Sequence, residues 1–272
     1  MNEPQASRSS AKTESSFSAF LVKLIFVVLI LRSFVFAPFS IPSESMLPRL
    51  LIGDYLVVAK WPYGFTHYSI PFSPPLWSGR VLGRDPERGD VVVFKAPPNQ
   101  RQDYIKRVIG LPGDLIEVRN GQVILNGAPV PRKRIADFIE PLTENSACKK
   151  ADAAQFREKA SDGWERCRYP RYREILPNGK SYDVLDLGTV PVDDTEVYSV
   201  PADHVFLMGD NRDRSADSRF PAAEGGGIGI VPTENIVGRA WFSIFSTDGS
   251  AEWLKPWTWL SAARWSRVGE GF

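Results

Sequence analysis

The hydrophobic pattern of the chain begins with one long apolar run near the N-terminus. Sixteen of the 19 residues from 19 to 37 are apolar, and the exceptions are Lys23, Arg32 and Ser33. As an α-helix rising about 1.5 Å per residue, this run reaches roughly 30 Å, the thickness of the hydrocarbon core of a bilayer. We therefore predict a transmembrane anchor over residues 17–38, preceded by a polar, disordered cytoplasmic tail over residues 1–16.

Two alternatives compete with a retained anchor. A cleaved signal peptide would use Val35 and Ala37 as the small residues before the cut, but Pro38 would then follow the cut and the uncharged core is short. A buried helix of a soluble protein would show a polar face at helical spacing, which residues 24–31 lack. The pattern favours the retained anchor.

Beyond Pro38 the pattern changes to short β-branched and aromatic runs separated by Gly, Pro, Asn or Asp. Such runs predict strands, and Asn120-Gly121 between two of them is a hairpin signal. No long amphipathic helix alternates with these runs, which argues against a parallel α/β sheet. The fold is predicted to be mainly β and antiparallel, with strands at 54–59, 90–94, 104–109, 115–118, 122–125, 204–208 and 238–245.

Changes in composition divide the chain after the anchor into three regions. Residues 39–131 and 200–250 hold the predicted strands and form the expected antiparallel β core, with a Pro- and Gly-rich excursion at 61–89. Residues 132–199 are more polar and predict an inserted, smaller cap of strands and loops. Residues 251–272 form a Trp-rich tail, which either docks on a bilayer interface or packs as an ordinary terminus.

Basic residues and cysteines indicate the orientation across the membrane. Arg8, Lys12 and Lys23 lie on the N-terminal side of the run and few basic residues follow it closely, so the positive-inside rule predicts a cytoplasmic N-terminus. Cys148 and Cys167 form an isolated pair in a polar stretch, which suits a disulfide in an oxidising compartment. Two unrelated free thiols are the alternative.

The overall composition argues against two classes of protein. With 33 Lys and Arg against 32 Asp and Glu, the net charge of +1 gives no basic field for nucleic acid, so no nucleic-acid partner is predicted. Two His and two Cys, without an HExxH or CxxC motif, predict no metal site.

Hydrolytic chemistry needs a nucleophile and a base, and the two histidines are poor candidates for the base. His67 lies in an aromatic loop and His204 in a strand-like run, where structural roles are expected. A lysine can serve instead, because burial disfavours the ammonium and lowers its pKa from about 10.4 toward neutrality. Lys106 and the serines of the proline-flanked loop 41–48 are the candidates, although each alone is typical of an exposed strand lysine or a simple stem.

Four segments that occur in order carry a resemblance to a known family. They are SMLP (45–48), RGDVVVF (88–94), YIKRVIGLPGD (104–114) and GDNRDRSADSR (209–219). Together they resemble the boxes of bacterial type I signal peptidase, the leader peptidase that removes signal peptides from exported proteins. The resemblance runs from the anchor to about Phe245.

The resemblance implies roles for individual residues. Ser45 would be the nucleophile and Lys106 the general base of a Ser–Lys dyad. Ser43 would donate its hydroxyl to an oxyanion hole together with the Ser45 backbone N–H, and Ser215 would orient the lysine amine. Four charged residues would form supporting ion pairs, which we interpret as structural first: Asp217 with Arg219, and Asp210 with Arg107.

The same resemblance implies a membrane-anchored serine endopeptidase that cuts after small residues of the Ala-x-Ala type through an acyl-enzyme, with no metal or organic cofactor. Its partners would be pre-proteins bearing signal peptides and the lipid bilayer. The catalytic domain would lie on the periplasmic side of the bacterial inner (cytoplasmic) membrane. Two positions depart from the family pattern: Arg214 stands where many members have Asn, and Glu44 where a small residue is common.

Two other functions remain as alternatives. A self-cleaving Ser–Lys peptidase of the SOS-repressor kind would carry a DNA-binding N-terminal region, whereas this chain has an apolar run. A noncatalytic, membrane-anchored assembly protein would leave Ser45 and Lys106 dispensable, and would not account for two distant motifs that pair so well.

Overall fold

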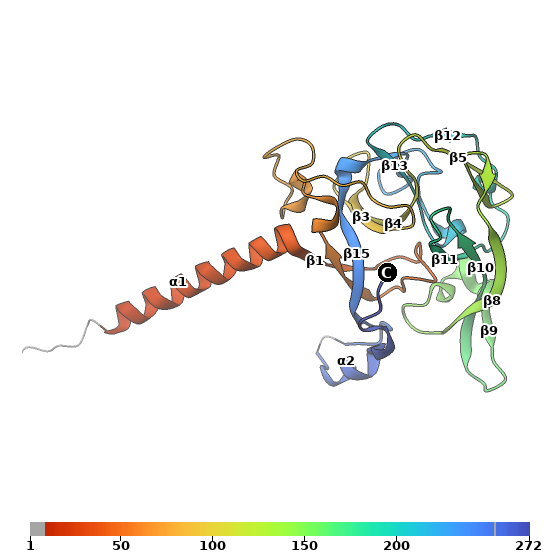
Figure 1. Cartoon of the computed structure of the whole chain (residues 1–272). Helices are drawn as coiled ribbons and strands as arrows, with labels where there is room; N and C mark the ends of the chain where they lie inside the picture. The colour runs from red at the N-terminus through yellow and green to blue at the C-terminus, as the bar shows by residue number, and fades with distance from the viewer. Residues whose placement is uncertain (1–8, 253) are drawn as a thin grey trace, which may run out of the picture.

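The computed structural model describes residues 9–252 and 254–272. Helix α1 (Ser9–Ile30) runs into a turn of π-helix (Leu31–Val35) and projects away from the β strands that follow it (Figure 1). The stretch Phe17–Val35 is long and apolar enough to cross a membrane, and almost none of it is buried. This exposure is contrary to the buried soluble helix considered above.

The helix has different limits from those predicted. Residues 1–8 of the expected disordered tail lie outside the described residues, but the chain is already helical from Ser9. Residues 9–16 contain no Pro or Gly, so nothing in them interrupts a helix that the apolar run continues. At the other end β1 (Phe36–Ser40) replaces the last part of the predicted anchor. Pro38 accounts for this, since proline cannot extend a helix and disfavours a helical residue before it.

The main sheet has seven strands in the order β1-β2-β15-β3-β4-β13-β14, and every neighbouring pair is antiparallel. The prediction of a mainly β, antiparallel fold with one N-terminal apolar helix is thus confirmed. The strands after β1 are β2 (Asp54–Ala59), β3 (Val91–Lys95), β4 (Asp103–Gly110), β13 (His204–Met208), β14 (Val231–Pro232) and β15 (Ile236–Ser246).

The main sheet is buried on both faces. Val91 and Val93 of β3 belong to a core cluster that includes Met46, whereas Val92 and Phe94 belong to a cluster with residues of β13. Successive side chains of a strand point to opposite faces, so a strand covered on both sides has no polar alternation. This burial explains the unbroken apolar run in β3.

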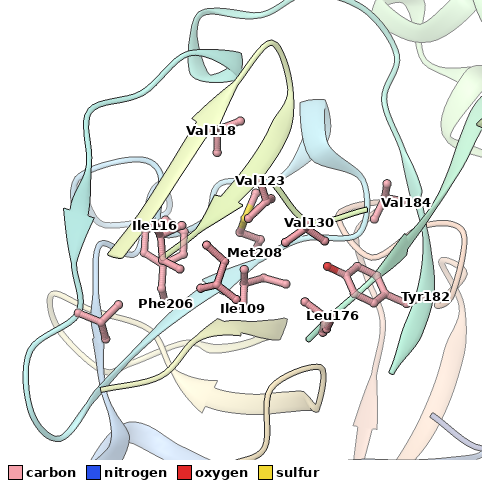
Figure 2. Packing of buried hydrophobic residues seen from close by; sticks show 12 residues of the cluster. Ile109, Ile116, Val118, Val123, Val130, Leu176, Tyr182, Val184, Phe206 and Met208 are labelled. Atoms are coloured by element: carbon pink, nitrogen blue, oxygen red, sulfur yellow. The ribbon is translucent and has the colours of Figure 1, made fainter. Parts of the chain in front are cut away.

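A second, small sheet has the order β12-β5-β6-β7 and packs over one end of the main sheet. Ile116 and Val123 from this sheet meet Ile109, Phe206 and Met208 of the main sheet in a shared core (Figure 2). Its hairpin turns at the predicted Asn-Gly pair, where both residues have positive φ. The strands are β5 (Leu115–Arg119), β6 (Gln122–Leu125), β7 (Ala128–Pro129) and β12 (Tyr198–Ser199).

A third sheet is built entirely within the predicted insertion. It consists of β8 (Arg132–Pro141), β9 (Arg157–Lys159), β10 (Glu165–Ile175) and β11 (Ser181–Leu185). Cys148 is bonded to Cys167 of β10, with the two Cα atoms 5.8 Å apart. Because β12 pairs with β5, the last residues of the predicted cap belong to the second sheet. The proposed domain limits stay a prediction.

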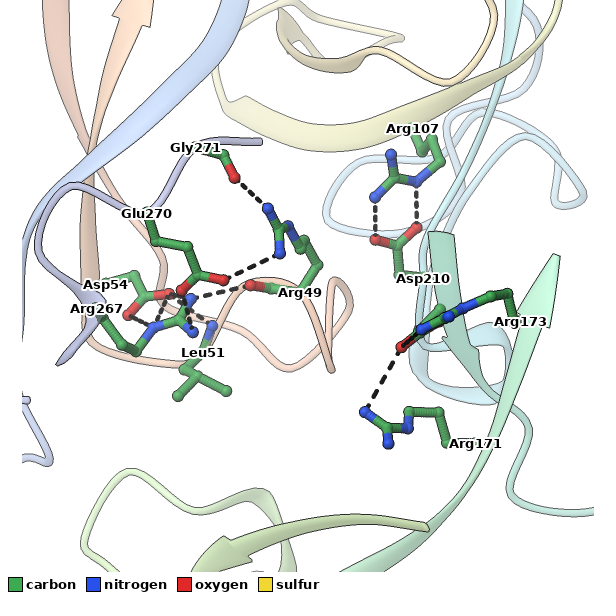
Figure 3. A network of polar contacts seen from close by, with 11 residues as sticks. Arg49, Leu51, Asp54, Arg107, Arg171, Arg173, Asp210, Arg267, Glu270 and Gly271 are labelled. Carbon is green, nitrogen blue, oxygen red and sulfur yellow. Dashed lines mark hydrogen bonds and ion pairs between the residues drawn. The ribbon is translucent and has the colours of Figure 1, made fainter. Parts of the chain in front are cut away.

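The C-terminal tail is packed at its end and exposed in its middle. Helix α2 (Trp257–Ala262) presents Trp257 to solvent. Beyond it, Arg267 binds the buried carboxylate of Asp54, with 2.6 Å between Nη2 and Oδ2 (Figure 3). The final residues are therefore part of the folded domain, and docking of the tail on a membrane stays a prediction.

Candidate active site

The loop between β1 and β2 carries Ser45. Ile41, Met46 and Leu50 anchor this loop in the core, and each is at most 2% exposed. The Ile41 N–H donates to the Asp54 carbonyl at 2.8 Å, which fixes the start of the loop to β2. Apolar packing on both sides thus holds the loop, and Ser45 itself is nearly buried.

Lys106 reaches Ser45 from the middle of β4. The register pairs Lys106 with Val92 on β3, so the lysine stands in the centre of the main sheet. Its Nζ lies 2.8 Å from Ser45 Oγ and 3.1 Å from the Ile105 carbonyl oxygen. The Tyr104 ring lies on the same face, with its centroid 5.6 Å from Nζ. Two residues 61 positions apart are therefore in hydrogen-bond contact.

The environment of Lys106 favours a neutral amine. Its side chain is buried, and desolvation lowers its pKa from 10.5 to about 8, although the negative charges of Asp217 and Asp210 oppose this shift. An amine with this pKa is partly neutral near pH 8 and can accept a proton. Lys106 can therefore act as a base toward the Ser45 hydroxyl, which is in hydrogen-bond contact with it.

Ser43 and a cavity complete the immediate surroundings. Ser43 Oγ lies 3.3 Å from Ser45 Oγ. Both hydroxyls and Lys106 line a cavity of about 520 Å³, whose other walls include Phe39 and Arg214. The Ser45 hydroxyl is thus accessible to a ligand although the residue makes little contact with bulk solvent.

The segment after β13 holds the serine loop from the other side. The Asn211 N–H donates to the Ser45 carbonyl at 3.1 Å, and its Nδ2 donates to the Glu44 carbonyl at 3.2 Å. A Cβ on Gly209 would lie 2.5 Å from the Ser45 carbonyl oxygen and 2.2 Å from Ser215 Oγ. Only glycine fits at this close approach. The sequence motif contained both residues, but gave no reason to assign them these contacts.

The two predicted charge pairs are present as buried, bidentate ion pairs. Arg219 binds Asp217 through two hydrogen bonds of 2.9 Å, and Asp217 also accepts the Gly209 N–H at 3.1 Å. Arg107 binds Asp210 with distances of 2.7 and 2.6 Å (Figure 3). Among the described residues, the Ser45 and Lys106 side chains form no hydrogen bond or ion pair with either of these pairs, which is consistent with a structural role.

A third buried ion pair was not predicted. Arg212 donates to both carboxylate oxygens of Glu174 on β10, at 2.8 and 2.5 Å, and Tyr182 on β11 donates to the same carboxylate at 2.7 Å. The guanidinium of Arg107 lies over the Tyr182 ring, 4.4 Å from its centroid. These contacts join the third sheet to the site. Glu174 lies in the polar insertion, where no sequence motif marks it.

The hydrogen bond expected between Ser215 and Lys106 is not formed. Ser215 Oγ is buried without a hydrogen-bond partner among the described residues. The side chain instead packs against Gly209, close to the Ser45 backbone, because the missing Cβ at Gly209 leaves room there. Ser215 thus borders the site without contacting the amine by a hydrogen bond.

The two positions that depart from the family pattern both contact the insertion. Glu44 is nearly buried and accepts a hydrogen bond from Lys150 at 3.2 Å. Arg214, which lines the cavity, forms an ion pair with Asp152. Both contacts connect residues beside the site to the segment that follows β8, so the insertion holds Glu44 and Arg214 in place.

Comparisons with known proteins support the resemblance drawn from the motifs. The model of the family described as signal peptidase, peptidase S26, matches residues 15–245. Signal peptidase I of Rickettsia typhi (strain ATCC VR-144 / Wilmington) is 33% identical over 286 residues, covering 96% of each chain. Signal peptidase I of Rickettsia prowazekii (strain Madrid E) is 34% identical, covering 96% of this chain and 94% of the relative.

A crystal structure of a signal peptidase I from Enterococcus faecalis V583 is 25% identical and covers 57% of this chain and 97% of that chain, with a TM-score of 0.29. The family match and the near full-length relatives define the class of protein: the chain is a peptidase. It belongs to the signal peptidase family, peptidase S26.

Proposed function

We propose that this protein is a membrane-anchored serine endopeptidase that removes N-terminal signal peptides from pre-proteins by means of a Ser45–Lys106 dyad. The observation that carries the proposal is the 2.8 Å contact between Lys106 Nζ and Ser45 Oγ in a nearly buried site that opens on a cavity. Family membership supports the substrate class, since the relatives carry the name signal peptidase I.

The proposed reaction is acyl transfer in two steps. Neutral Lys106 takes the Ser45 hydroxyl proton as Oγ attacks the scissile carbonyl carbon, and the resulting ammonium gives that proton to the leaving amine. Water then attacks the acyl-enzyme, giving a proton to Lys106, which returns it to Ser45 Oγ. The pKa of about 8 for Lys106 supports its role as the base. No step requires a metal or an organic cofactor.

Ser43 is proposed to stabilise the oxyanion together with the Ser45 backbone N–H. Its hydroxyl lies 3.3 Å from Ser45 Oγ, at the rim of the same cavity. Donors fixed around a developing oxyanion lower the barrier more than mobile water does, and losing one donor typically reduces the rate by about 10²–10³. In this proposal Ser215 packs beside Ser45, and does not orient the amine through a hydrogen bond.

The register of β4 supports binding of an extended substrate. Along one edge β4 pairs with β3 over residues 103–107, whereas β13 pairs only with Arg107, Val108 and Gly110 on the other edge. Residues 103–106 therefore have a strand partner on one side in the part of the chain that the structure describes. A substrate segment can add as a strand beside them, next to Ser45 and Lys106. Small residues such as Ala at the Ala-x-Ala positions are the expected side chains.

The covalent order of the chain supports cleavage at the membrane surface. The apolar stretch ends at Val35, and Ser45 follows ten residues later. A signal peptide is itself a membrane-spanning segment, so its cleavage site emerges at the same depth. The disulfide between Cys148 and Cys167 fits an oxidising compartment and supports the periplasmic side of a bacterial inner membrane.

The test compares cleavage of a pre-protein with an Ala-x-Ala junction by the detergent-solubilised full chain and by Ser45→Ala. We expect the wild type to cut after the second Ala of the junction, as measured by mass, and Ser45→Ala to be inactive. Ser181→Ala, which removes an exposed hydroxyl on β11, is the matched control and should cut normally.

Two results would overturn the proposal. Equal cleavage by Ser45→Ala would mean that another residue is the nucleophile. Absence of cleavage by the wild type, with the fold intact by circular dichroism, would favour the noncatalytic assembly protein. The SOS-repressor alternative gains no support from the N-terminal part, because α1 is an apolar helix that stands apart from the β strands (Figure 1).

A further inference from the structure

A second cavity lies where the apolar helix enters the β domain. It has a volume of about 430 Å³ and is not lined by Ser45 or Lys106, although Phe39 and Asp103 line both this cavity and the one at Ser45. Arg32 from the end of the helical segment lines it, together with Lys60, Lys95, Arg101 and Asp103. We call this cavity the basic pocket.

The charges of the basic pocket do not balance. Four cationic side chains face one carboxylate, and Asp103 is already paired with Lys95, with 3.0 Å between Oδ1 and Nζ. Among the described residues Lys60 forms no ion pair, and its Nζ donates to the Ser69 carbonyl oxygen. An ammonium has three N–H donors, so one neutral acceptor leaves most of its hydrogen-bonding capacity unused.

The lack of an anionic partner for Lys60 is costly because the side chain is only 4% exposed. Its pKa is lowered from 10.5 to about 8, mainly by desolvation and also by the positive charges of Arg32 and Lys95, against which Asp103 acts to raise it. A buried cation without an anion is unfavourable, and an anion in the pocket would remove this cost. The side chains therefore complement a ligand that carries negative charge.

The backbone fixes the depth of the pocket relative to the membrane. The Lys60 N–H donates to the Val35 carbonyl at 3.1 Å, and β1 pairs with β2 so that Phe36 lies opposite Ala59. Lys60 is thus tied to the last residue of the apolar stretch Phe17–Val35. In a bilayer-spanning chain this level is the headgroup region, where lysine and arginine side chains reach lipid phosphates.

Exposed apolar residues lie next to the basic pocket. Phe72 lines it and is fully exposed, in a backbone conformation with φ of 67°, and Leu76 on the same segment is 67% exposed. Phe65 of the same excursion contacts Phe34 of the helical segment, with ring centroids 5.2 Å apart. An apolar rim beside a cationic pocket, both at the end of a membrane helix, suits a molecule with an acyl chain and an anionic head.

We propose that the basic pocket binds the phosphate of an anionic phospholipid, with the acyl chains lying along α1 and the Phe72 rim. The depth of Lys60 and the apolar rim favour a lipid headgroup over a free phosphate ion. This inference concerns a site outside the Ser45–Lys106 cavity and does not depend on the proposed peptidase mechanism.

The experiment measures lipid binding to the full chain in detergent by native mass spectrometry. The probes are dihexanoyl phosphatidylglycerol, dihexanoyl phosphatidylcholine and inorganic phosphate. We expect phosphatidylglycerol to bind at least about tenfold more tightly than phosphatidylcholine, and Lys60→Met to abolish this preference. Lys133→Met, which removes an exposed lysine on β8, is the matched control and should bind as the wild type does.

A second variant guards against misfolding of Lys60→Met. Arg101 is exposed, so Arg101→Gln should leave the fold intact and reduce phosphatidylglycerol binding by several fold. Equal binding of the two lipids by the wild type would overturn the proposal, as would unchanged phosphatidylglycerol binding in both pocket variants. If inorganic phosphate binds as tightly as phosphatidylglycerol, the headgroup assignment is wrong.

Discussion

At the scale of single residues, the site depends on the amine of Lys106, whose protonated form is disfavoured by burial. Lys106 is nearly buried in the centre of the main sheet, and this burial lowers its pKa to about 8. The negative charges of Asp217 and Asp210 stabilise the protonated form of Lys106, but each carboxylate also forms an ion pair, with Arg219 and Arg107 respectively. The ion pairs thus limit how far nearby negative charge restores the protonated state.

The rate of cleavage is therefore expected to depend on pH through Lys106. Below its pKa of about 8, kcat/KM should rise about tenfold per pH unit as the neutral amine increases, and it should level off above that pH. Lys106→Arg, which keeps the charge but cannot act as a base near neutrality, should be inactive at every pH. Initial rates with a signal-peptide substrate between pH 6 and 10 test this expectation, and a flat profile would contradict it.

At the scale of secondary-structure elements, the site is assembled from strands of different sheets. The serine loop follows β1, Lys106 lies on β4 and Gly209 follows β13, while Glu174 on β10 clamps the segment after β13 through Arg212. Strands far apart in sequence thereby share buried charges. Removing one partner of such a pair leaves the other charged and unsolvated.

Glu174→Gln is accordingly expected to lower the free energy of unfolding by about 3–5 kcal/mol, because Arg212 would remain buried without a carboxylate. The matched control is Asp183→Asn on β11, whose carboxylate pairs with the exposed Arg173 at 2.7 Å and with Arg171 at 3.5 Å. The Arg173 and Asp183 side chains are 52% and 20% exposed, so water can solvate both charges and the loss should cost at most about 1 kcal/mol. Denaturant unfolding of the full chain in detergent measures both values, and equal losses would show that burial is not decisive.

At the scale of the whole molecule, the C-terminal residues contact the loop that carries Ser45 and the start of β2. Asp54 at the start of β2 is completely buried, and its carboxylate accepts the Leu51 N–H at 2.8 Å and two nitrogens of Arg267. Arg49 reaches Glu270 at 3.0 Å from the same loop (Figure 3). The C-terminal residues therefore stabilise the loop that carries Ser45.

Arg267→Gln should weaken this arrangement, because Asp54 would become a buried carboxylate without its cation. We expect a loss of about 2–5 kcal/mol in the free energy of unfolding and a lower kcat for cleavage. Lys255→Gln removes an exposed charge from the same tail, where Lys255 pairs with Glu252, and should change neither quantity. A stable, fully active Arg267→Gln would mean that the tail is dispensable for the loop.

The sequence indicated which segments are strands more reliably than where helices end. Runs such as that of β3 are apolar because both faces of the main sheet are covered, and this burial is visible as composition. The apolar stretch begins at Phe17, as in the predicted anchor, but α1 already begins at Ser9 and β1 takes the place of the last predicted residues from Phe36. Helix ends depend on backbone hydrogen bonding, which hydropathy does not report.

By itself the sequence determined the local features: the apolar helix, the strand-forming runs, the Asn-Gly turn and the motif residues Ser45 and Lys106. The helix, the strand-forming runs and the turn follow from side-chain chemistry within a few positions along the chain, whereas Ser45 and Lys106 were singled out by the resemblance of four ordered segments to a known family. Only the tertiary structure decided that Lys106 is buried next to Ser45 and that Ser215 forms no hydrogen bond with the amine. It also decided that Arg212 binds Glu174 and that Lys60 is buried without an anion. These properties arise from contacts between residues distant in sequence, and the desolvation that they produce exists only once the sheets have packed.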